Sequence, residues 1–97
     1  MARRRIEVQN IVSPGHIQSV DADKYEATRD AYLAVLTREA PGMTPAEIKA
    51  ALTPKLPEDL FPGGATAGWW AKCVQLDLEA RGVIVRAAGS PVRLRKA

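Results

Sequence analysis

Four basic side chains near the carboxyl terminus carry the clearest chemistry in this sequence. They are Arg86, Arg93, Arg95 and Lys96. Guanidinium and ammonium groups donate hydrogen bonds to phosphate oxygens, so this set predicts binding to a polyanion such as a nucleic-acid backbone. A basic edge strand that keeps the sheets of separate molecules from pairing is the alternative interpretation.

Two further residues, which come earlier in the sequence, would extend a polyanion-binding surface formed by these cations. Lys72 and Gln75 lie opposite an apolar stripe of Trp70, Val74 and Leu78, whose spacing is typical of one helix face. A lysine pairs with phosphate or guanine, and a glutamine binds adenine through two hydrogen bonds. Alternatively, both residues are solvated positions on the helix surface.

Trp69 precedes the stripe and cannot share the orientation of Trp70, because neighbouring helical residues point about 100° apart. It either packs beneath the preceding loop or is exposed as an anchor for a protein partner. In the second case, a protein-interaction surface would contain Trp69 together with Leu56, Leu60 and Phe61.

Residues for catalysis or metal binding are few. His16 is the only histidine and Cys73 the only cysteine, and they fall on different predicted elements without a metal-ligand spacing. The pair Gly63 and Gly64 has neither a preceding strand nor a following Lys-Ser/Thr, so it is not a phosphate-binding loop. We therefore expect no enzymatic activity, no metal and no cofactor.

The 97 residues suit one domain, and the net charge of +3 is unevenly distributed. Residues 3–5 and 81–97 contain basic side chains and no acid, whereas the acids lie between Glu7 and Glu79. No apolar run approaches the roughly 20 residues that cross a bilayer. A single cysteine excludes an internal disulfide and fits a reducing compartment. These features predict a cytoplasmic protein.

The elements that would position these side chains can be read from local signals. Residues 1–5 form a basic tail, and residues 6–97 form the domain. Within it, residues 6–20 are either a β-hairpin around a Ser-Pro-Gly-His turn or an extended arm. A first helix should begin near Asp21 or Asp23 and end near Glu39.

The second helix has the strongest local signal. Thr44 is the expected cap, and Glu47 three residues later completes a capping box. Pro45 takes the first helical position, and Pro54 ends the helix. Residues 53–68 then form a long connection, either functional or a packed Ω-loop. A third helix, capped by Thr66, ends at Gly82; strands follow at residues 83–86 and 92–96.

Three helices followed by a two-stranded hairpin is the order of a winged helix-turn-helix, a mainly α fold with a small β component. Residues 78–84 (LEARGVI) resemble the end of the third helix and the first wing strand common in that superfamily. Residues 44–48 (TPAEI) resemble the start of its second helix. The connection at residues 53–68 is longer than the few residues that usually join the second and third helices.

The whole chain resembles a small bacterial family of uncharacterised proteins, and this resemblance implies no activity. It is carried by residues 20–27 (VDADKYEA), 56–64 (LPEDLFPGG), 68–72 (GWWAK), 74–80 (VQLDLEA) and 90–94 (SPVRL).

Together these features predict a winged-helix protein that binds nucleic acid, in particular duplex DNA, with a regulatory role. The hairpin cations would hold phosphates, helix three would meet the groove, and residues 3–5 would add a basic arm. The alternative is a protein-interaction module that uses Trp69 and the loop from Leu56 to Phe61. Homodimer formation through the first helix or the N-terminal hairpin is also open.

Overall fold

The structure is a computed structural model that describes residues 4–97, which form a small mixed α/β domain. Its helices and strands are, in chain order, β1 (Arg5–Val8), β2 (Gln18–Asp21), α1 (Ala22–Val35), α2 (Pro45–Leu52), α3 (Ala67–Ala80), β3 (Ile84–Arg86) and β4 (Leu94–Lys96). Two short 3₁₀ turns, Thr53–Lys55 and Pro62–Gly64, lie between α2 and α3.

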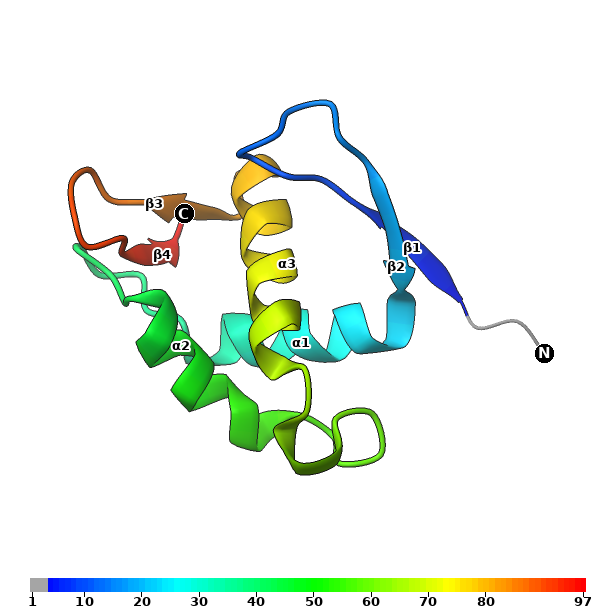
Figure 1. Cartoon of the computed structure of the whole chain (residues 1–97). Helices are drawn as coiled ribbons and strands as arrows, with labels where there is room; N and C mark the ends of the chain where they lie inside the picture. The colour runs from blue at the N-terminus through cyan, green and yellow to red at the C-terminus, as the bar shows by residue number, and fades with distance from the viewer. Residues whose placement is uncertain (1–3) are drawn as a thin grey trace.

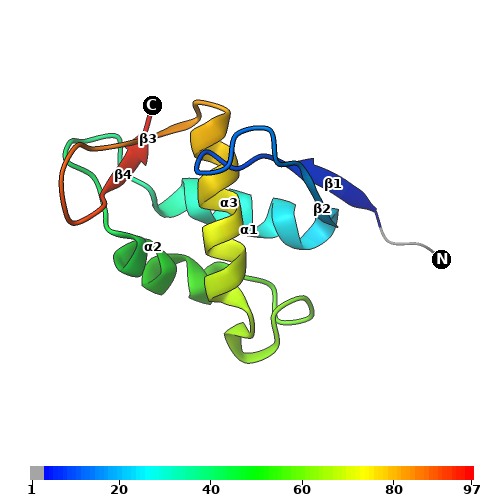
Figure 2. The ribbon, with the colours of Figure 1, turned by 45° about the horizontal axis from the view of Figure 1, so that its top comes forward.

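Helix α3 occupies the centre of the molecule (Figure 1). It crosses α1, and the antiparallel pairs β1–β2 and β3–β4 lie on opposite sides of it. The turned view in Figure 2 shows the same order, with the loop between β1 and β2 lying over the carboxyl half of α3. One side of α3 is therefore buried against α1, and part of its opposite side faces the N-terminal hairpin.

Helix α1 begins where the sequence predicts and ends earlier. The Asp21 side chain accepts a hydrogen bond from the backbone N–H of Lys24, which caps the helix. The predicted end near Glu39 is wrong, because Leu36 is already extended and buried. The next residue, Thr37, offers its carbonyl to the N–H of Lys96 at 2.9 Å, so the chain leaves the helix to contact β4.

The capping box of α2 is confirmed. Thr44 Oγ1 accepts from the N–H of Glu47 at 3.2 Å, and Glu47 Oε1 accepts from the N–H of Thr44 at 2.9 Å. Ile48 and Leu52 are buried, as expected for the apolar face, whereas Ala51 is exposed. The box fixes the point at which the chain turns into α2.

The connection between α2 and α3 is a packed loop. The N–H of Phe61 donates to the Pro57 carbonyl at 2.9 Å, which closes the helical turn expected there. Phe61 is buried, and its ring meets Trp70 edge-on with the centroids 6.4 Å apart. The segment is therefore packed on the core, as a packed loop requires.

The ends of α3 are formed in different ways. Gly82 has a φ of +75°, and the N–H groups of Gly82 and Val83 donate to the Glu79 and Leu78 carbonyls at 3.2 and 2.9 Å. This is a Schellman motif, and it confirms the predicted stop. At the other end, Thr66 is left-handed and its side chain makes no capping bond to the helix. The predicted Thr66 side-chain cap is therefore wrong.

Both hairpins are observed. β1 pairs with β2 from Arg5 opposite Asp21 to Val8 opposite Gln18, so the segment predicted as a hairpin or an arm is a hairpin. β3 pairs with β4, which starts at Leu94 rather than at residue 92 as predicted. Met43, just before α2, exchanges two 2.8 Å backbone hydrogen bonds with Leu94 and extends this second ladder.

The basic residues at the amino end are largely part of the fold. Arg4 forms ion pairs with Asp23 and Glu26 at 2.6 and 2.8 Å, and Arg5 belongs to β1. The predicted basic arm is therefore wrong for Arg4 and Arg5, and Arg3 lies outside the described residues. Among residues 4–97, no helix combines the length and apolar character needed to cross a bilayer.

Candidate interaction groove between α3 and the N-terminal hairpin

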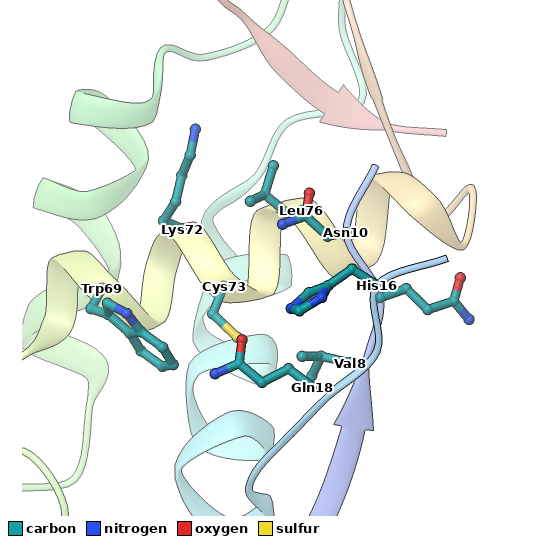
Figure 3. Close-up of a pocket in the computed structure, with 9 residues that line it drawn as sticks. Val8, Asn10, His16, Gln18, Trp69, Lys72, Cys73 and Leu76 are labelled. Atoms are coloured by element: carbon teal, nitrogen blue, oxygen red, sulfur yellow. The ribbon is translucent and has the colours of Figure 1, made fainter. Parts of the chain in front are cut away.

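A groove of about 180 Å³ runs between α3 and the N-terminal hairpin (Figure 3). We call it the α3–hairpin groove. Helix α3 contributes Trp69, Lys72, Cys73 and Leu76, and the hairpin contributes Val8, Gln9, Asn10, His16 and Gln18. The helical residues recur at intervals of three and four, so they form one continuous strip along α3.

Three hydrogen bonds fasten the hairpin to α3. The N–H of Ile11 donates to the Leu76 carbonyl at 3.2 Å, and the N–H of Gln9 donates to Asp77 Oδ1 at 2.7 Å. Arg81 Nη2 donates to the Glu7 carbonyl at 3.1 Å. These bonds join residues more than 60 positions apart, so the groove depends on the tertiary fold.

Asp77 is buried behind the groove and connects the elements that form it. Its side chain is buried and accepts hydrogen bonds from the Tyr25 hydroxyl, the Gln9 N–H and Arg81 Nε, the last at 2.9 Å. Burial and this carboxylate raise the pKa of Tyr25, so the phenol remains a donor. The carboxylate thus connects α1, α3 and the hairpin through three satisfied bonds.

Trp69 is the exposed aromatic side chain of the groove. It is 52% exposed, and its ring stands edge-on to Trp70 with centroids 4.9 Å apart. The expectation that Trp69 packs beneath the loop is therefore wrong, because Trp70 takes the contact with Phe61. Trp69 instead lies at the edge of the groove, where a partner can reach it.

Cations outnumber acids around Trp69. Lys72 lines the groove, and the hollow on the other side of the tryptophan is lined by Arg5, Lys24 and Asp21. The acid, Asp21, already accepts the α1 capping bond. A negatively charged group is therefore favoured beside this aromatic ring.

Cys73 and His16, predicted on separate elements, line the same groove (Figure 3). Within residues 4–97, no hydrogen bond joins them. Burial, with a smaller effect of Asp77, raises the pKa of the Cys73 thiol to about 11, so the thiolate is scarce at neutral pH. The described part of the chain also holds no cluster of three His, Cys, Asp or Glu residues suited to a metal ion.

The four hairpin cations do not share one surface. Directly opposed residues in an antiparallel pair point to the same face, and Arg86 is opposite the buried Leu94. Arg95 is opposite Val85 and therefore lies, with Arg93, on the other face. Lys96 opposes Ile84 and falls on the side of Arg86. The four cations therefore do not form one phosphate-binding surface: Arg93 and Arg95 share one strand face, and Arg86 and Lys96 share the other.

Each arginine of the C-terminal hairpin also has a contact within the molecule. Arg86 binds Glu79 through two hydrogen bonds of 2.9 and 3.0 Å. Arg93 donates to the Gly42 carbonyl at 3.4 Å, and Arg95 donates to the Lys96 carbonyl at 3.2 Å. The bidentate Arg86 pair is the strongest of these, so its guanidinium is the least available to a ligand.

The two candidate residues on α3 differ in position. Lys72 is exposed, and its side chain extends away from the other labelled groove residues in Figure 3. Gln75 is only 2% exposed and donates to Glu79 Oε2 at 3.2 Å. The expectation that Gln75 faces outward is therefore wrong, because it lies four residues after buried Ala71 on the inner side.

The loop residues proposed to accompany Trp69 face inward. Leu56 and Phe61 are buried, and Leu60 is half-buried against the core. They stabilise the loop and leave Trp69 as the exposed member of that set.

Sequence reasoning missed the groove residues from the hairpin, because backbone hydrogen bonds place them. The burial of Asp77 could have been predicted, because it lies seven residues after Trp70 and therefore on the buried stripe.

A family profile covers most of the chain. It spans residues 5–94, which include the N-terminal hairpin, the three helices, strand β3 and every residue of the α3–hairpin groove. No curated protein and no solved structure matches the chain. The chain belongs to the family of unknown function DUF6958.

Proposed function

We propose that this protein is a protein-interaction module whose α3–hairpin groove binds a segment of another protein. The segment carries an aromatic or aliphatic anchor next to carboxylates. The observation that carries the proposal is the half-exposed Trp69 at the edge of a groove surrounded by cations. Tryptophans in this setting are frequent anchors of protein interfaces.

The apolar surface near the groove supports the proposal. Ile11, Val12 and Ile17 project from the hairpin loop, and Val12 is 68% exposed. Ile11 and Val12 also line a hollow with Val85 on the wing side of α3. Apolar side chains gathered on one side of a small monomer mark a contact surface more often than scattered ones do.

Charge favours an acidic partner. Within the described residues Lys72 has neither an ion pair nor a hydrogen bond, and Arg5 donates to Ser19, a neutral residue, and forms no ion pair. A carboxylate near these groups would gain Coulomb energy without displacing an internal acid. The aromatic or aliphatic residue of the bound segment would bury apolar area, and its carboxylate would fix the orientation of the segment.

The arrangement of elements supports a relation to winged helix-turn-helix proteins within this proposal. The order is three helices and then a hairpin, and the Met43–Leu94 bridge adds the short strand position that precedes α2. The N-terminal hairpin lies over the carboxyl half of α3, on the side that a groove-reading helix would present to DNA. This cover favours a protein partner over duplex DNA.

The test is a selection from a random peptide library on the full chain, with removal of peptides that bind Trp69→Ala. Enriched peptides should combine one aromatic or large aliphatic residue with Asp or Glu, and Trp69→Ala should weaken them at least about tenfold. Lys72→Glu should lose the acidic peptides and retain the melting temperature. Failure to enrich any Trp69-dependent peptide would reject the proposal.

Nucleic-acid binding is the second candidate, supported by Arg93 and Arg95 on one strand face. Two phosphate contacts would give a log–log salt slope of roughly −1.8 with a random duplex DNA. Titration of the duplex at two salt concentrations measures this slope. Binding tighter than about 10⁻⁴ M at low salt that is lost in Arg93→Gln/Arg95→Gln would favour this candidate. Weaker binding would leave the protein-interaction proposal.

A further inference from the structure

A second cavity of about 190 Å³ lies between α2 and α3, separate from the α3–hairpin groove. Lys49 comes from α2, Lys72 and Gln75 come from α3, and Tyr32 of α1 also lines it. Lys72 borders both the cavity and the groove, and in Figure 3 its side chain extends away from the groove residues.

The hydroxyl of Tyr32 has no hydrogen-bond partner among the residues that the structure describes. The residue is 1% exposed, and its buried hydroxyl makes no hydrogen bond within the described part of the chain. Burial raises the pKa of this phenol, so the hydroxyl remains protonated and can donate. Buried hydroxyls are nearly always hydrogen-bonded in native proteins, and Tyr32 lines the cavity, so its hydroxyl can donate to an acceptor bound there.

The charge around the cavity is positive. Its lining includes two lysines and no carboxylate. The nearby Glu79 is bound by Arg86 through two hydrogen bonds, which compensates its charge. Neither Lys49 nor Lys72 forms an ion pair within residues 4–97. Both ammonium groups are therefore available to an anion.

Gly68 lets Lys49 approach α3. A Cβ atom at this position would lie 3.3 Å from Lys49 Nζ and 3.4 Å from its Cε. The lysine of α2 thus reaches across to the first turn of α3, and Lys72 follows Gly68 by one helical turn. The two cations come from different helices and border one space.

We propose that this cavity binds a small organic anion. Its carboxylate or phosphate head lies between Lys49 and Lys72 and accepts a hydrogen bond from the Tyr32 hydroxyl. A short aliphatic body fits against Pro45, Ala46 and Ala71, which complete the lining. The volume equals that of about six water molecules at ~30 Å³ each, so the ligand is small.

The experiment is a ¹H–¹⁵N NMR titration of the full chain with butyrate, butyl phosphate and the neutral control butyramide. At least one of the anions should give saturable shifts at the amides of Gly68, Ala71 and Lys72, and the two anions distinguish a carboxylate from a phosphate head. Butyramide should give none. Lys49→Gln should weaken binding about tenfold, whereas the exposed Lys55→Gln outside the cavity should leave it unchanged.

The Tyr32→Phe variant distinguishes an effect on anion affinity from an effect on the stability of the fold. Removing a hydroxyl that lacks a partner should keep or raise the melting temperature of the free protein, while anion binding weakens about fivefold or more. A merely structural tyrosine would leave the affinity unchanged. The proposal is overturned if neither anion gives saturable shifts at these amides, or if the shifts persist unchanged in Lys49→Gln or Tyr32→Phe.

Discussion

At the scale of single residues, Asp77 shows how one buried acid is stabilised and what it supports. Its carboxylate accepts from a phenol, a backbone amide and a guanidinium, so its charge is both hydrogen-bonded and paired. Helix α1, helix α3 and the N-terminal hairpin meet at this group. The shape of the α3–hairpin groove therefore depends on a residue that does not line it.

Substitution of this acid gives the first prediction. Asp77→Asn removes the charge facing Arg81 and one acceptor oxygen, so it should lower the free energy of unfolding by roughly 3 kcal/mol. Tyr25→Phe, which removes one donor, should cost about 1 kcal/mol. Urea unfolding measures both, with the exposed Asp59→Asn as control. Equal stability of Asp77→Asn and the control would contradict this description.

Cys73 gives a second prediction at the residue scale. Its thiol pKa of about 11, raised first by burial, implies little thiolate at pH 8. Alkylation by iodoacetamide should therefore be about a hundredfold slower than for a free thiol with a pKa near 8.5. Mass spectrometry over time measures the rate in the native chain and in urea. A rate equal in both states would show that the fold does not protect the thiol.

At the scale of elements, Gly42 fixes the contact between β4 and the start of α2. Its φ is +99°, and an added Cβ would lie 2.3 Å from the Leu94 carbonyl oxygen. Gly82 also has a positive φ, but its Cβ would meet nothing. Gly82 is therefore required only for its positive φ, whereas Gly42 is required both for its positive φ and for the close approach of Leu94.

Alanine at each position tests this difference. Gly82→Ala should cost about 1 kcal/mol, because only the left-handed conformation is penalised. Gly42→Ala should cost about 3 kcal/mol or more, because β4 must also move away from the start of α2. Thermal unfolding of both variants measures the difference. Similar losses would show that the Met43–Leu94 contact adapts easily.

The capping box of α2 gives the pH prediction. Hydrogen bonds from the Thr44 backbone and side chain hold the pKa of Glu47 below its ordinary value of 4.5. A lowered folded pKa means that the unfolded chain binds protons first, so this contribution is present above pH 4.5 and is lost as the pH falls through the folded pKa. Glu47→Gln keeps an acceptor oxygen without the charge.

The stability advantage of the native chain over Glu47→Gln should therefore be constant from pH 7 to about 5 and shrink below 4.5. Chemical unfolding at a series of pH values measures it. A difference that stays the same down to pH 3 would show that the ionised carboxylate contributes nothing to the cap.

At the scale of the whole molecule, local signals predicted the elements and tertiary contacts decided the site. Thr44, Glu47 and Gly82 act within their own turns, so the sequence predicted α2 and the end of α3 correctly. The position of the N-terminal hairpin depends on bonds such as Ile11 N–H to the Leu76 carbonyl, which no side-chain pattern encodes.

The C-terminal hairpin shows a different reason why a predicted site differed from the structure. Ile84 is buried, and Arg86 follows it by two residues, so both belong to one strand face. Grouping Arg86 with Arg93 and Arg95 ignored this alternation. The expectation that Gln75 faces outward likewise followed its polarity, although its spacing of four residues from Ala71 puts it on the inner side of α3.

The central claim is that the α3–hairpin groove is a docking surface for an acidic, apolar-anchored segment. Its most direct test is a chemical-shift map of the full chain with a peptide selected through Trp69. We expect saturable shifts at the Trp69 indole, at Cys73 and Leu76, and along residues 9–18 of the hairpin. Shifts confined to the C-terminal hairpin around Arg93 and Arg95, or a map unchanged in Trp69→Ala, would contradict it.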